Sequence, residues 1–140
     1  RDSLRIEMGY PLYGHEISES ITVLEAGLER YCKFEKGNFI GRAALEQQKA
    51  NGVRRTLVGL EMQERGIARD GYKVLDGAGC EIGYVTSGSY APFLKKNIAL
   101  AYVPPEHSGI GTTLGVAIRG QVAKAQVAPT PFYKRPQKAA

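Results

Sequence analysis

Residues 55–62 read RTLVGLEM, and from this point the side-chain pattern of the chain repeats every second residue. That period is typical of a β-strand with one face buried and the other outside. The stretch therefore predicts a strand that covers a core with one of its faces. Leu57, Gly59 and Glu61 fall on one face, and Thr56, Val58, Leu60 and Met62 fall on the other.

Downstream of this strand, short β-prone segments alternate with turn signals. Ser87-Gly88 reads as a turn, and Arg119-Gly120 reads as a tight hairpin turn. Six short strands at this spacing predict a small antiparallel six-stranded barrel or a sandwich. The five further segments are Tyr72–Leu75, Glu81–Thr86, Asn97–Val103, Thr113–Ile118 and Gln121–Val127.

Upstream of the strand, the pattern favours short helices. Residues 41–50, GRAALEQQKA, are rich in strong helix formers, and residues 21–31 carry apolar side chains at helical spacing. Asp2 or Ser3 is suited to cap a helix at the start of the chain, which begins at Arg1 without methionine. We therefore expect a piece of a longer protein, mainly β in an α+β class, with a domain boundary near Gly52.

Composition bounds the classes of function. The chain has 140 residues, a hydrophobic fraction of 43%, a charged fraction of 24% and a net charge of +5, which excludes a mainly disordered chain. Twelve of the 19 basic residues follow residue 50, but they are scattered, so we expect neither a nucleic-acid nor a membrane partner. Cys32 and Cys80 are too few for a disulfide scaffold and favour a cytoplasmic protein with reduced thiols.

Few residues have the spacing that catalysis or metal binding requires. His15-Glu16 and Glu106-His107 lack a third ligand, and both histidines are expected in exposed loops. There is no Gly-rich phosphate loop and no metalloprotease motif. Residue patterns alone therefore predict neither a catalytic residue nor a metal site.

Several motifs, in order along nearly the whole chain, resemble the carboxyl-terminal part of the glycine cleavage T-protein family of aminomethyltransferases. They are RDSLRIEMGYPLYGHEI at 1–17, LEAGL at 24–28, KGNFIGRAAL at 36–45, IGYVTSGSYAPFLKKNIALAYV at 82–103, IRG at 118–120 and PFY at 131–133. The resemblance implies that residues 1–52 are the incomplete end of the folate-binding middle domain. Residues 53–140 would be the carboxyl-terminal β-barrel with a basic, frayed tail from Pro129 onward.

The resemblance also implies a reaction. Members of the family take an aminomethyl group from the lipoylated H-protein, release ammonia and pass the one-carbon unit to tetrahydrofolate. Arg1, Tyr133 and Arg135 match family positions around folate, whereas the catalytic residues lie upstream of this chain, which by itself is expected to be inactive. The remaining tyrosines of interest (Tyr13, Tyr84, Tyr90, Tyr102) are interpreted as packing residues, and Gly83 and Gly88 as turn residues.

Related families share this barrel and leave alternatives open. The folate-binding domain of a sarcosine or dimethylglycine dehydrogenase is one, and a stand-alone basic β-barrel that binds another macromolecule is a second. Iron–sulfur assembly folate-binding proteins carry a cysteine in the motif that reads KGNFIG here, where Asn38 stands at that position. This difference argues against that third group.

Overall fold

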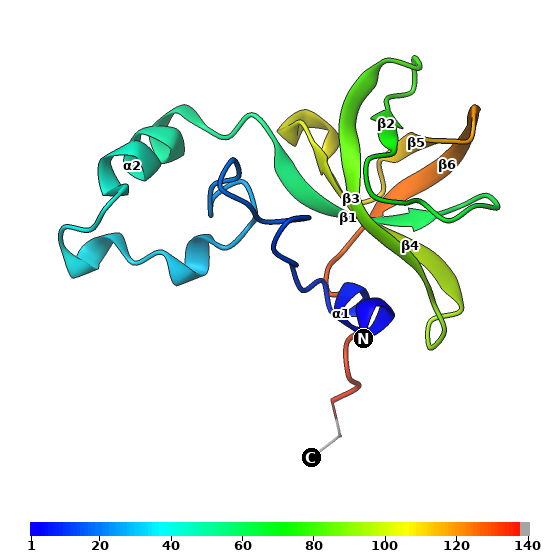
Figure 1. Ribbon diagram of the computed structural model, residues 1–140, viewed down its shortest axis with the longest axis horizontal. Helices are drawn as coiled ribbons and strands as arrows, with labels where there is room; N and C mark the ends of the chain where they lie inside the picture. Colours follow the sequence, from blue (N-terminus) through cyan, green and yellow to red (C-terminus); the bar gives the residue numbers. More distant parts are fainter. Residues whose placement is uncertain (138–140) are drawn as a thin grey trace.

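Two parts make up the computed structural model, which describes residues 1–137: a β-barrel and an arm, residues 18–55, that extends from it (Figure 1). The helices are α1 (Asp2–Glu7), η1 (Glu29–Tyr31), η2 (Phe34–Lys36), α2 (Arg42–Asn51) and η3 (Pro105–His107). The strands are β1 (Thr56–Met62), β2 (Lys73–Leu75), β3 (Glu81–Ala91), β4 (Lys96–Val103), β5 (Thr113–Ile118) and β6 (Gln121–Ala128).

The six strands close into an antiparallel barrel in the order β1-β4-β3-β2-β5-β6. Strand β1 joins the two ends of the sheet, since Leu60 pairs with Ala99 of β4 and with Val127 of β6. The turn at Arg119-Gly120 has positive φ at both residues, 48° and 80°, as a tight hairpin requires. The six predicted strands and the antiparallel barrel are therefore confirmed.

Two apolar clusters lie on the two faces of the barrel wall. The inner cluster contains Val58, Leu60 and Met62 of β1, so the predicted division of that strand into two faces is confirmed. On the outer face, Ile6 of α1 packs with Ala91, Ile98 and Leu100, and Leu57 joins this cluster. Helix α1 thus covers the outside of β3 and β4.

Strand β3 differs from the sequence prediction because it continues to Ala91 through the expected turn at Ser87-Gly88. A bulge between Val85 and Ser87 bends the strand at that point instead. A Cβ on Gly88 would overlap the carbonyl oxygen of Ala68, and a Cβ on Gly83 would overlap that of Tyr102. The turn interpretation of Gly83 and Gly88 is therefore wrong: Gly83 permits close approach of the β4 backbone, and Gly88 that of the connection between β1 and β2.

The arm contains less regular structure than its sequence pattern suggested. Residues 21–31 form turns and the short helix η1, because Gly27 has φ +71° and interrupts the expected helix. The predicted helix at 41–50 is confirmed as α2, although none of its residues is buried. In α1 the capping residue is Arg1, and no side chain caps the helix. Asp2 lies inside the first turn and accepts a bond from Arg5 Nε at 2.7 Å, so the predicted cap is wrong.

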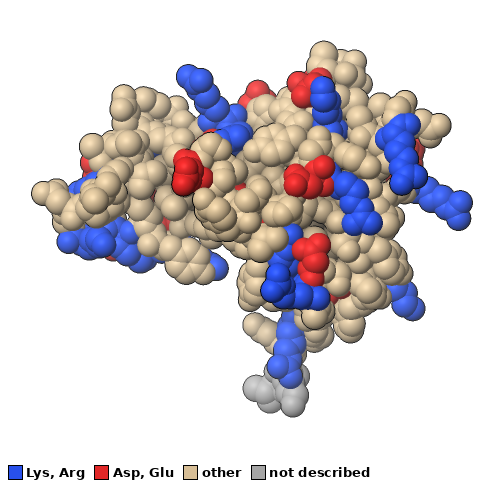
Figure 2. Space-filling model, viewed as in Figure 1, with Lys and Arg blue, Asp and Glu red and all other residues tan. Residues whose placement is uncertain are grey.

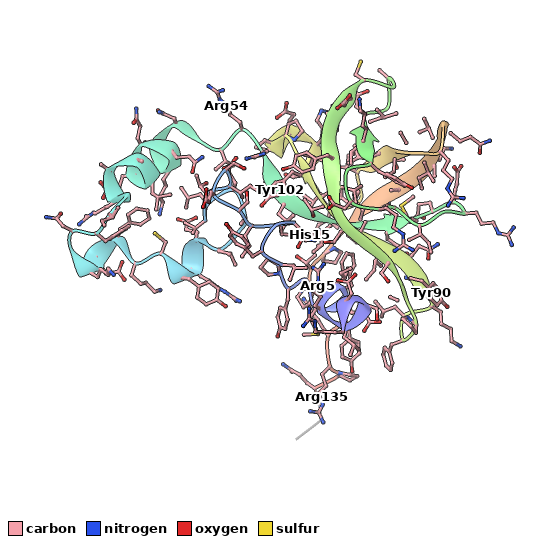
Figure 3. All side chains as sticks on the ribbon, in the orientation of Figure 1. Arg5, His15, Arg54, Tyr90, Tyr102 and Arg135 are labelled. Carbon is pink, nitrogen blue, oxygen red and sulfur yellow. The ribbon has the colours of Figure 1, made fainter. Side chains whose placement is uncertain are left out.

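A buried carboxylate holds the amino-terminal segment on the barrel. Glu16 is fully buried, and its carboxylate accepts hydrogen bonds from Arg5 Nη1 at 3.2 Å, the Leu12 N–H at 2.9 Å and Thr86 Oγ1 at 2.8 Å. Its carbonyl oxygen accepts a bond from Tyr102 Oη at 2.7 Å. Arg5 projects from α1 and Tyr102 from β4 of the barrel (Figure 3). We call these residues the Glu16 network.

We expect Glu16→Ala to lower the free energy of unfolding by about 3–5 kcal/mol, because it removes the fully buried carboxylate that accepts hydrogen bonds from Arg5, the Leu12 N–H and Thr86. Denaturant titration of the two proteins measures this difference. The matched control is Glu46→Ala, which removes a carboxylate paired with Arg42 at 3.0 Å on the exposed helix α2. An exposed pair contributes about 0–1 kcal/mol. Equal losses in the two variants would contradict the prediction.

We expect Gly88→Ala to destabilise the barrel by about 1–3 kcal/mol or more, because the new Cβ meets backbone that cannot move aside. Gly77→Ala is the control, since a Cβ there has no heavy atom within 4 Å and the φ of Gly77 is not positive. Thermal unfolding of both variants checks the difference. A neutral Gly88→Ala would show that β3 and the segment at Ala68 are not in tight contact.

Candidate functional site

Residues 129–133 form a strap, which crosses the outer face of β1 toward α1. A Cβ on Gly59 of β1 would lie 2.7 Å from the Phe132 ring and 2.7 Å from the Thr130 methyl group, so the strap rests directly on this glycine. The expected frayed tail is therefore wrong for residues 130–133. The end of that tail, residues 138–140, lies outside the described residues.

Tyr133 is held at two points of the strap. Its backbone N–H donates to the Glu7 carbonyl at 3.1 Å, which ties the strap to the end of α1. Its ring meets Phe93 edge to face, with ring centroids 4.9 Å apart and planes at 80°. Phe93 belongs to the connection between β3 and β4. Tyr133 is thus placed where the strap, α1 and this hairpin come together.

Arg1 and Arg135, the other two predicted folate contacts, have exposed side chains. Within residues 1–137, neither forms an ion pair. Arg1 precedes α1, and its carbonyl accepts the Arg5 N–H at 3.1 Å. Arg135 lies beyond the strap on the side of α1 (Figure 3). The structure therefore brings Tyr133 into contact with α1 and leaves both guanidinium groups in solvent at this end of the molecule.

A groove of about 510 Å³ opens beside the strap. Its walls come from four separate parts of the chain: the segment after α1, the arm, the outer face of the barrel, and the strap. A volume of this size is in the range of small-molecule sites. The lining residues are Met8, Gly9, Tyr10, Pro11, Ala26, Gly27, Leu28, Arg30, Tyr31, Leu57, Val58, Leu100, Thr130 and Pro131.

Aromatic rings and one cation give the groove its chemistry. Tyr10 and Tyr31 expose 59% and 66% of their surface, enough to stack on a flat ring. Arg30 donates to Tyr31 Oη at 2.7 Å, and its guanidinium lies 4.7 Å from the centre of the Tyr31 ring. An arginine in this position can pair with a carboxylate. No local motif joins the four segments that form this groove, so it could not be predicted from the sequence.

The arm wall of the groove is fixed by an ion pair. Arg55 Nε donates to the Glu25 carboxylate at 2.6 Å, and the Glu25 carbonyl accepts the Leu57 N–H at 3.2 Å. Burial opposes ionisation of Glu25, but hydrogen bonds from the Thr22 N–H and Arg55 outweigh it and hold the pKa of Glu25 below its ordinary value. The ion pair therefore contributes stability above the ordinary pKa of a glutamate. That stability is lost as the pH falls through the lowered pKa.

The four tyrosines interpreted as packing residues divide into two pairs. Tyr102 is buried and lies 5.9 Å from Tyr84, ring centre to ring centre, so the interpretation is confirmed for both. Burial raises the pKa of the Tyr102 phenol, which keeps its proton and donates to Glu16. Tyr13 and Tyr90 expose 66% and 46% of their surface, and for them the interpretation is wrong.

Histidines and cysteines supply no metal centre in the part of the chain that the structure describes. His15 was expected to be exposed, but it is half-buried, with Nδ1 3.1 Å from the Thr86 carbonyl oxygen and 3.3 Å from Asp70 Oδ2. Cys32 and Cys80 are free thiols. Among residues 1–137, no three His, Cys, Asp or Glu side chains are grouped to hold a metal ion. Within the same residues, no helix has the length and apolar character to cross a membrane.

Comparison with known proteins gives concordant results. Residues 55–134 match the family described as the glycine cleavage T-protein C-terminal barrel domain. Aminomethyltransferases from Koribacter versatilis and Acidobacterium capsulatum are 64% and 59% identical over 99% and 100% of this chain. The chain spans 36% and 37% of the length of these two relatives.

Comparison with solved structures also leads to an aminomethyltransferase. The crystal structure of glycine cleavage system aminomethyltransferase T from Bartonella henselae superposes with a TM-score of 0.90 at 34% identity. The superposition covers 94% of this chain and 37% of that chain. With its six-stranded closed barrel and its match over residues 55–134, the chain belongs to the glycine cleavage T-protein family.

Proposed function

We propose that the chain works as the carboxyl-terminal part of an aminomethyltransferase. The parent enzyme would transfer the one-carbon unit from a lipoylated H-protein to tetrahydrofolate and release ammonia. The observation that carries this proposal is the 64% identity to an aminomethyltransferase over 99% of the chain. The same relatives favour this function over the folate-binding domain of a demethylating dehydrogenase or a stand-alone binding barrel.

The groove beside the strap supports a folate ligand at this end of the molecule. Its tyrosine rings suit a pterin or an aminobenzoyl ring, and Arg30 suits a carboxylate. Tyr133, Arg1 and Arg135 do not line this groove; they lie next to it, at the end of the strap and the start of α1. We propose that folate extends from the groove to these residues, where Tyr133 offers a ring face and Arg1 and Arg135 pair with its polar and anionic groups. Tetrahydrofolate, when bound, supplies the nitrogens that accept the one-carbon unit.

The residues of this chain would bind and orient folate rather than carry out the bond exchange. The Glu16 network fixes α1 and the segment after it, and the Glu25–Arg55 pair fixes the facing wall of the groove. A preorganised wall lowers the entropy cost of bringing two reacting groups together. We assign no catalytic residue to the chain, and we propose that the catalytic groups belong to the upstream part of the parent enzyme.

We also propose that residues 1–52 complete a middle domain with that upstream part, whereas residues 53–140 form the barrel domain. The support comes from the arm, whose apolar side chains line a second groove of about 650 Å³. Ile40 is fully exposed, and α2 buries none of its residues. Exposed apolar side chains gathered in one region are typical of a protein contact. The occupant that we propose is the upstream part of the parent chain.

A lipoylated H-protein is the macromolecular partner that the proposed reaction requires. Basic and acidic side chains are interspersed on the face shown in Figure 2, which does not favour a nucleic-acid surface. We propose that neither nucleic acid nor a membrane is a partner, and that the protein works in the cytoplasm. Two free thiols are in keeping with that location.

We expect the isolated 140-residue chain to give only background aminomethyl transfer, because the proposed catalytic groups lie upstream. The assay supplies loaded H-protein and tetrahydrofolate, and follows ammonia and 5,10-methylenetetrahydrofolate. The full-length parent enzyme is the positive control. Turnover by the isolated chain would place the catalytic groups within these residues, and an inactive parent enzyme would overturn the proposed function.

In the full-length parent enzyme we expect Arg1→Ala to weaken tetrahydrofolate binding by roughly one to two orders of magnitude. A hydrogen bond to a charged group contributes about 1.5–3 kcal/mol, and every 1.4 kcal/mol corresponds to a factor of about ten. Calorimetry measures the affinity, and H-protein binding serves as the quantity that should not change. Unaltered folate affinity would remove Arg1 from the site.

A further inference from the structure

The tip of the β3–β4 hairpin is a fixed structure rather than a free loop. The Lys95 N–H donates to the Ala91 carbonyl at 2.8 Å and closes the turn. Ala91 is buried and Leu94 packs against the outer cluster that contains Ile6 of α1. The two residues fasten the tip to the helix. Phe93 lies between them and nevertheless exposes 69% of its surface.

Among residues 1–137, the exposed Phe93 ring has one aromatic neighbour, the Tyr133 ring, which it meets edge to face with the ring centroids 4.9 Å apart. The backbone of Tyr133 is held by Glu7, but this bond leaves the side chain free to rotate about its Cα–Cβ bond. An edge-to-face pair has a preferred geometry and therefore selects among the orientations of the tyrosine ring. Phe93 is mounted on a tip that is itself fastened to α1, so the backbone from which its ring projects is fixed, and the pair limits the orientations of both rings.

We propose that Phe93 is a positioning residue that holds the Tyr133 ring in the orientation in which it meets folate. This inference rests on the proposed function of Tyr133. With 69% of its surface in solvent, Phe93 buries little area, so its removal should cost little stability. Removal of the Phe93 ring should instead weaken folate recognition, because without it the Tyr133 ring would sample several orientations before folate binds.

The test uses the full-length parent enzyme with the variants Phe93→Ala, Phe93→Tyr and Tyr133→Ala. We expect Phe93→Ala to raise the KM for tetrahydrofolate by about two- to tenfold, the factor that corresponds to one aromatic pair. The kcat, the KM for H-protein and the Tm should stay close to the wild-type values. Phe93→Tyr keeps the ring edge and should restore the folate KM.

Tyr90→Ala is the matched control, because Tyr90 belongs to the same hairpin, exposes 46% of its surface and forms no aromatic pair among residues 1–137. It should leave the folate KM unchanged. An equal rise in the control, an unchanged KM in Phe93→Ala, or a failure of Phe93→Tyr to restore it would overturn the inference.

The double variant Phe93→Ala/Tyr133→Ala separates this inference from the proposal beneath it. If Phe93 acts through Tyr133, its replacement should have no further effect once Tyr133 is gone. Additive effects would overturn the positioning role alone. If Tyr133→Ala leaves the folate KM unchanged, the assignment of Tyr133 fails, and the role of Phe93 fails with it.

Discussion

Full burial of one carboxylate, that of Glu16, constrains the position of residues 1–17 on the barrel. A charge without water must receive hydrogen bonds from the protein, and here they come from α1, from the loop after it and from β3. Each donor is therefore held at a distance set by a single group. The groove depends on this arrangement, since Met8 to Pro11 lie between Arg5 and Glu16 and form one of its walls.

The barrel architecture could be predicted because residues close together in the sequence indicate each strand and turn. The alternation in β1 and the Arg119-Gly120 turn each indicate structure within a few residues. The turn interpretation of Gly83 and Gly88 was wrong for the opposite reason. Their role is to admit the carbonyl oxygens of Tyr102 and Ala68, and these contacts form only after distant segments fold together. A glycine in a turn and a glycine at a close backbone approach look alike in a sequence.

The candidate site could be predicted from the sequence only in part. Family motifs led to Arg1, Tyr133 and Arg135, and the structure adds the contacts of Tyr133 with Glu7 and Phe93. The groove itself has no sequence signature, because its lining residues extend from Met8 to Pro131. The docked strap was missed as well, since proline and basic residues usually accompany frayed ends, and the contact of the strap with Gly59 is tertiary.

The pairing of β1 with β6 has a consequence for the way the protein is made. During synthesis β1 leaves the ribosome first among the strands, and β4 covers one of its edges. The other edge keeps its unpaired N–H and C=O groups until β6, the last strand, has emerged. An exposed strand edge is a template for pairing with another chain. Nascent chains that stall between β4 and β6 would therefore be vulnerable to aggregation, and closure of the barrel would be the step that ends this risk.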